Sequence, residues 1–86
     1  SGWGARKIAM QLRTKGVEKE VIAEALATID RDEQGDRLAE KLRRKMRTTK
    51  AQSDYEMRGK LLRYALGLGY DYDDANTALD KIMAER

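Results

Sequence analysis

The sequence contains one helical pattern twice, offset by 53 positions as from Ile8 to Leu61. The matching positions are Ile8 with Leu61, Leu12 with Ala65, Gly16 with Gly69, Val17 with Tyr70, Leu26 with Leu79, and Ile29 with Ile82. Each copy has the pattern of a helix, a glycine, an apolar or aromatic residue, an acidic residue and a second helix. Because such a unit is too small to bury its own apolar face, two copies are predicted to share a core.

Composition favours an all-α chain and excludes several kinds of chemistry. The 86 residues include no proline, and they are rich in the strong helix formers Ala, Leu, Glu, Lys and Arg. There is no cysteine and no histidine, which excludes disulfides, thiolate nucleophiles, imidazole acid–base catalysis and the usual structural zinc sites. No apolar run approaches the ~20 residues that span a bilayer. We therefore expect a cytoplasmic protein, and the opening Ser1-Gly2 suggests missing upstream sequence.

Apolar spacing and capping residues predict five helices. They cover about 5–15, 18–29, 33–48 with an N-cap at Asp32, then from the capping box at Ser53 to about 68, and finally 71–83. Gly16 and Gly69 are predicted to end helices in the left-handed conformation. We expect an elongated, right-handed-type array of tandem three-helix repeats. Residues 1–50 form the first repeat in this prediction, and residues 51–86 form a truncated second one.

The net charge of +3 is unevenly distributed. Residues 36–63 carry ten basic and four acidic groups, whereas residues 64–86 carry two basic and five acidic groups. The centre could therefore meet an anionic partner, and the acidic end a basic one. A solvated helix face is the simpler explanation of the basic run. Without interleaved aromatic residues, sequence-specific nucleic-acid binding is not expected, but weak, salt-sensitive attachment to DNA is.

Catalysis and metal binding find little support. The carboxylates, lysines and tyrosines sit where helix capping and solvation explain them. Asp71, Asp73 and Asp74 could offer oxygen ligands to calcium, but the segment lacks the glycine and distal glutamate of an EF-hand loop. Acidity at a helix N-terminus is the favoured explanation. We expect no enzyme activity, no cofactor and no metal.

The two copies resemble the second and third repeats of the RecX regulatory proteins. The first copy matches their aromatic residue, glycine, basic pair and isoleucine, and later their Lys-Gly-aliphatic and Ala-Leu pairs. The matching residues are Trp3-Gly4-Ala5-Arg6-Lys7-Ile8, Leu12, Lys15-Gly16-Val17 and Ala25-Leu26. In the second copy they are Lys60 to Leu66, Gly69-Tyr70, Asp74 and Leu79.

This resemblance implies a modulator of RecA, the recombinase that forms filaments on single-stranded DNA. RecX-type proteins consist of three tandem three-helix repeats that bind along the filament groove. They restrain strand exchange, ATP hydrolysis and the co-protease activity of the SOS response. The implied partners are the RecA filament and, weakly or through it, single-stranded DNA, with the chain acting as a monomer.

Charge and expected exposure select the candidate contact residues on the basic helix and on the helices that open each unit. They are Arg6, Lys7, Arg43, Arg44, Arg47, Lys50, Lys60 and Arg63.

A second interpretation concerns the last third of the chain. Leu66-Gly67-Leu68-Gly69-Tyr70, followed by Ala75 and Ala78-Leu79, is similar to the loop and third helix of ubiquitin-associated domains. That similarity implies a protein- or peptide-binding module. Exposure of Tyr70 distinguishes the two interpretations: a buried ring supports a structural repeat, and an exposed ring supports a docking loop.

Overall fold

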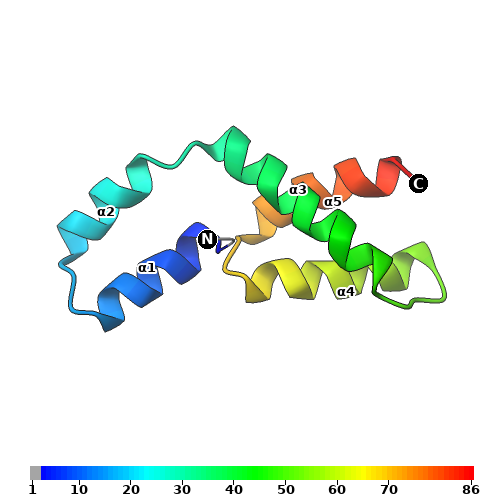
Figure 1. Cartoon of the computed structure of the whole chain (residues 1–86), viewed down its shortest axis with the longest axis horizontal. Helices are drawn as coiled ribbons and strands as arrows, with labels where there is room; N and C mark the ends of the chain where they lie inside the picture. Colours follow the sequence, from blue (N-terminus) through cyan, green and yellow to red (C-terminus); the bar gives the residue numbers. More distant parts are fainter. Residues whose placement is uncertain (1–2) are drawn as a thin grey trace.

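The computed structural model describes residues 3–86, and these residues are all-helical, as predicted. Its five helices are α1 (Ala5–Thr14), α2 (Lys19–Ala27), α3 (Arg31–Arg47), α4 (Asp54–Gly67) and α5 (Tyr72–Ala84). They form an elongated molecule of 45 × 22 × 18 Å, with the α1–α2 hairpin at one end and α3, α4 and α5 at the other (Figure 1). The radius of gyration is 14.2 Å, against about 12 Å for a compact domain of this length.

Helices α3, α4 and α5 form a three-helix bundle that holds most of the core. Its five largest fully buried side chains come from all three helices: Leu38, Leu42, Leu61, Leu79 and Ile82. Alanines at the crossings, among them Ala39, Ala65 and Ala75, let the helices approach closely. The apolar stripe of α3 is therefore one wall of the same core that α4 and α5 line.

The predicted division after residue 50 does not match this packing. Helix α3 packs on α4 and α5, while α2 packs on α1. The physical reason is that the Leu38 and Leu42 stripe meets apolar stripes only across the bundle. Residues 31–84 therefore pack as one three-helix unit.

The α1–α2 hairpin uses the same sequence pattern as α4 and α5 but is less covered. Ala78 is buried in the bundle, whereas Ala25, its counterpart in α2, is exposed. Leu61 is fully buried, whereas Ile8, its counterpart in α1, is only half-buried. Within residues 3–86, no helix packs on the hairpin as α3 packs on α4 and α5.

The two parts meet backbone to backbone at the start of α1. The amide of Gly4 donates to the carbonyl of Leu68 at 2.8 Å, and the amide of Arg6 donates to the carbonyl of Gly69 at 3.2 Å. Free N–H groups at one helix start thus satisfy carbonyls beyond the end of α4. This junction fixes the hairpin to the loop between α4 and α5 (Figure 1).

Helix ends follow the sequence prediction to within about two residues, and one N-cap differs. Gly16 and Gly69 adopt φ values of 83° and 92°, which confirms their role as left-handed terminators. The Ser53 side chain caps α4 by accepting from the amide of Glu56. The N-cap of α3 is Asp30 rather than Asp32, because the Asp30 carboxylate accepts from the amides of Asp32 and Glu33.

Tyr70 is only 3% exposed and belongs to the bundle core. Burial raises the pKa of its phenol. By the criterion stated above, this burial supports a structural repeat and contradicts the docking loop of a ubiquitin-associated module. Tyr72, two residues later, is exposed.

Candidate functional site

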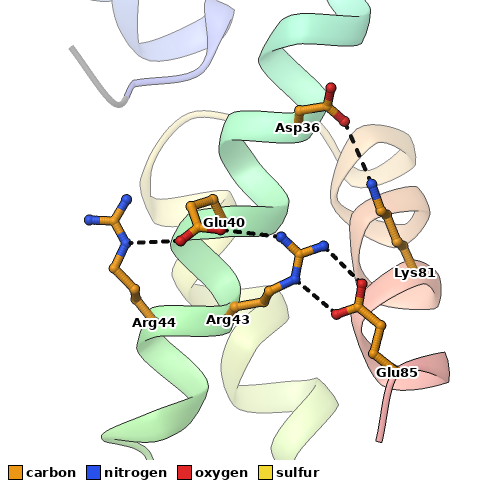
Figure 2. Close-up of polar contacts among 6 residues, drawn as sticks. All are labelled: Asp36, Glu40, Arg43, Arg44, Lys81 and Glu85. Carbon is orange, nitrogen blue, oxygen red and sulfur yellow. Dashed lines mark hydrogen bonds and ion pairs between the residues drawn. The ribbon is translucent and has the colours of Figure 1, made fainter.

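One side of the basic helix α3 faces α5, and its charges are paired there. The guanidinium of Arg43 makes two hydrogen bonds to the Glu85 carboxylate, at 2.8 and 2.9 Å, and a third to Glu40 at 3.3 Å (Figure 2). Hydrogen bonding to Arg43 lowers the pKa of Glu85, and the same contact raises the pKa of Arg43. Arg43, a predicted contact residue, is therefore half-buried and committed to packing α3 on α5.

Further ion pairs cross between the helices of the bundle. Their nitrogen–oxygen distances lie between 2.8 and 3.7 Å: Arg31 with Asp74, Lys81 with Asp36, Arg58 with Asp80, and Arg86 with Asp54. Most of these side chains are solvent-exposed, so each pair contributes little stability by itself. Of these four pairs, only Arg58 with Asp80 joins a cation of residues 36–63 to a carboxylate of residues 64–86, so most cations of the basic centre are not neutralised by them.

Other predicted contact residues keep their charge available. Arg44 lies across Glu40 from Arg43 and points away from α5 (Figure 2), with a distance of 3.7 Å to Glu40. Arg47, Lys50 and Arg63 are exposed, and no carboxylate in residues 3–86 forms an ion pair with them. These four cations lie on α3, on the following loop and on α4.

Lys60 is only partly available. Its ammonium donates to the backbone carbonyl of Lys50 at 2.6 Å and lies 3.3 Å from the Glu56 carboxylate. Those contacts tie α4 to the loop that precedes it. Lys60 thus has a structural role, although its half-buried ammonium stays near the exposed cations.

A shallow basic groove lies between α3 and α4. It has a volume of about 250 Å³ and is lined by Lys41, Arg44, Lys45, Thr48 and Tyr64. The Lys45 ammonium lies 4.9 Å from the centre of the Tyr64 ring, a cation–π contact that positions it. The predicted list omitted Lys41 and Lys45, although their spacing of three and four residues with Arg44 and Thr48 places all four on one face of the helix.

The remaining predicted residues, Arg6 and Lys7, lie on α1 at the junction with α4. Arg6 is exposed, and the Lys7 ammonium lies 4.9 Å from the Trp3 ring centre. Both line a cleft separate from the α3–α4 groove. Arg6 and Lys7 thus lie on α1, whereas the other six predicted residues lie on α3, the loop after it and α4.

The acidic cluster at the start of α5 caps that helix. The Asp71 side chain accepts from the amide of Asp74 at 2.9 Å, and Asp74 in turn pairs with Arg31. Within the described part of the chain, no group of three or more carboxylates could hold a metal ion. Helix capping accounts for these residues, as the sequence favoured. Nor does any helix in residues 3–86 have the length and apolar character needed to cross a membrane.

Comparison with known proteins gives one consistent family. The model of the second three-helix domain of RecX matches residues 1–26, and that of its third three-helix domain matches residues 32–79. The second match coincides with the α3–α5 bundle. No solved structure matches the chain significantly.

Several curated relatives cover nearly the whole chain. A protein named regulatory protein RecX from Clostridium botulinum (strain Alaska E43 / Type E3) is 38% identical over 83 residues, covering 93% of the chain and 39% of the relative. Its namesake from Mycobacterium avium (strain 104) is 35% identical over 86 residues, covering 99% of the chain and 48% of the relative. The chain thus spans less than half the length of these relatives. On these matches and the three-helix bundle they cover, the chain belongs to the RecX family.

Proposed function

We propose that the chain is part of a regulator that binds the RecA filament on single-stranded DNA. In this proposal it restrains strand exchange, ATP hydrolysis and co-protease activity, and so modulates DNA repair and the SOS response in the cytoplasm. Family membership supplies the type of activity, since its relatives carry the name regulatory protein. The exposed cations of this chain form the proposed contact surface.

One observation supports the proposal above the others: one side of α3 faces α5, and the cations on its other side face solvent. The ion pair with Glu85, just after α5, occupies Arg43. Arg44, Arg47, Lys50 and Arg63 remain directed to solvent. Clustered, exposed cations create a positive potential that favours a phosphate backbone or an acidic protein groove.

The elongated shape fits a repeating partner. A filament presents the same surface at regular intervals, so weak contacts at several points along the 45 Å molecule add up to a useful affinity. A small globular partner would engage only one end. We therefore propose contacts from both the bundle and the hairpin, with Arg6 and Lys7 at the second site.

Charge reversal tests the proposed surface. Arg44→Glu with Arg47→Glu is expected to weaken binding to preassembled RecA filament, because two solvent-exposed cations become anions. The matched control is Lys15→Glu with Lys19→Glu, which makes the same charge change at the far turn between α1 and α2. Fluorescence anisotropy of labelled protein measures both. Equal filament affinity of the two double variants, with unchanged circular dichroism melts, contradicts the proposed surface.

A further inference from the structure

A cleft runs between the α1–α2 hairpin and the end of α4. Its volume is about 610 Å³, within the range of about 300–1,000 Å³ that is usual for binding pockets. The lining residues come from three helices and the loop after α4: Ala5, Arg6, Lys7, Ala9, Met10, Arg13, Leu26, Leu66, Gly67 and Gly69. The backbone hydrogen bonds from Gly4 and Arg6 to the loop after α4 fix the two walls relative to each other.

Apolar side chains line much of this cleft, and two of the large ones are exposed. Met10 on α1 is 53% exposed and Leu66 on α4 is 37% exposed. Leu26 adds a half-buried side chain from α2. Because methionine is unbranched and adapts its shape, such surfaces accommodate apolar side chains of a partner. The cleft thus offers an apolar docking surface between rigid helices.

The charged residues of the cleft are all basic. Arg6, Lys7 and Arg13 line it, and no carboxylate does. The neighbouring hollow beside Trp3 contrasts with it, since Asp30 and Glu33 share that lining with a single arginine. No ion pair within residues 3–86 occupies Arg6 or Arg13. A ligand of this cleft is therefore expected to carry negative charge.

Gly67 keeps the α4 wall open. It is the last residue of α4, its φ is not in the left-handed region, and a Cβ added to it would meet nothing within 4 Å. Neither backbone conformation nor packing requires glycine here, although glycine weakens a helix relative to alanine. Close approach of another backbone is a use of glycine that matches this position.

We propose that this cleft binds an acidic segment of a partner protein, with an apolar side chain held between Met10 and Leu66 and carboxylates facing Arg6 and Arg13. The apolar floor favours a peptide over nucleic acid, because the lining includes no aromatic ring on which a base could stack. The proposal goes beyond the proposed function, since it assigns a second, protein-binding site that is separate from the α3–α4 cations.

The test uses a fluorescein-labelled amphipathic peptide of glutamate and leucine, with a matched peptide of lysine and leucine as the control ligand. The chain is expected to bind the acidic peptide saturably and the basic one not at all. Met10→Asp is expected to weaken that binding about tenfold or more, by placing a charge on the apolar floor. Val21→Asp is the matched control: Val21 is 51% exposed on α2 and lies outside the cleft.

Two further variants test the other features of the cleft. Gly67→Leu is expected to weaken peptide binding by filling the opening, since a Cβ at this position meets no atom within 4 Å. Arg13→Glu is expected to weaken it more than Lys19→Glu, which makes the same type of charge change on a residue outside the cleft. Circular dichroism melts confirm that each variant is folded.

Absence of saturable binding to the acidic peptide overturns the inference, as does equal binding by Met10→Asp and Val21→Asp. The inference is also overturned if a single-stranded oligonucleotide displaces the acidic peptide and Met10→Asp binds that peptide as well as the parent does. Those two results together would indicate a general cationic surface. The assay contains neither RecA nor DNA-bound filament. Its result is therefore independent of whether the proposed function is correct.

Discussion

Gly4 lies so close to the backbone of Gly69 that it has no room for a side chain, and Gly69 has none because Lys7 lies against it. A Cβ on Gly4 would lie 2.5 Å from the carbonyl carbon of Gly69, a separation that real Cβ atoms do not tolerate. The contact exists because the amides of Gly4 and Arg6 donate to the carbonyls of Leu68 and Gly69. This pair of glycines sets the angle between hairpin and bundle, and with it both walls of the junction cleft.

Gly4→Ala is expected to destabilise the junction by about 1–3 kcal/mol, the usual range for overpacking. Amide hydrogen exchange should show faster exchange in α1, while α3 and α5 keep their protection because their core is separate. Gly67→Ala is the control, since a methyl group there meets no atom. Unchanged protection of α1 in Gly4→Ala would show that the hairpin is held by other contacts.

The two left-handed glycines are expected to respond differently to substitution. Gly16→Val is expected to lower the free energy of unfolding by about 1–2 kcal/mol, the backbone cost of the left-handed conformation. No packing cost is added, because nothing lies within 4 Å of the added Cβ. Gly69→Val adds a clash with Lys7 and should destabilise more. Gly35→Ala, in open space within α3, should stabilise by roughly 0.5–1 kcal/mol. Chemical denaturation of the three variants measures their stabilities relative to the parent. Equal denaturation midpoints for Gly16→Val and the parent would contradict the predicted cost at Gly16.

Acid should weaken the contact between α3 and α5. Arg43 lowers the pKa of Glu85 in the folded protein, so the stabilisation is present above the ordinary glutamate pKa of about 4.3 and is lost as pH falls through the lower folded value. Glu85→Gln is expected to remove part of this acid dependence. Urea unfolding at neutral and acidic pH measures it, with Glu24→Gln on α2 as an exposed control. An identical pH dependence in Glu85→Gln and the parent would contradict a stabilising role.

Alkaline pH should destabilise the fold by ionising Tyr70. Burial raises its pKa in the folded protein, so the unfolded chain ionises first and stability falls as pH rises above about 10. Tyr70→Phe is expected to lose less stability than the parent between neutral and strongly alkaline pH. Tyr72→Phe, at an exposed position, should behave like the parent. Thermal melts over this pH range distinguish the variants, and an equal loss in Tyr70→Phe would contradict the effect of burial.

The sequence predicted the local structure better than the packing. Helix positions follow from apolar spacing, and the left-handed turns at Gly16 and Gly69 follow from the repeat, because both depend on neighbouring residues. The grouping of helices depends on long-range contacts. A periodic stripe on α3 shows that the helix has a buried face but not which neighbouring helices bury it.

The candidate site also depends on long-range contacts that the sequence alone does not reveal. Arg43 and Arg44 are adjacent cations in the sequence, yet Arg43 pairs with Glu85, 42 residues away, while Arg44 points to the other side of α3. Charge composition could not separate them, because the partner comes from the end of the chain. Lys41 and Lys45 could have been found from their helical spacing with Arg44. The junction cleft could not, since it depends on how the hairpin meets α4.

The most direct test of filament recognition is an anisotropy titration of the labelled chain with preassembled RecA filament and, separately, with the same single-stranded DNA free of RecA. The account predicts tight binding to the filament, weak binding to the DNA alone, and a steep loss of the DNA binding as salt rises. Equal affinity for filament and bare DNA, or no binding to the filament, would contradict it.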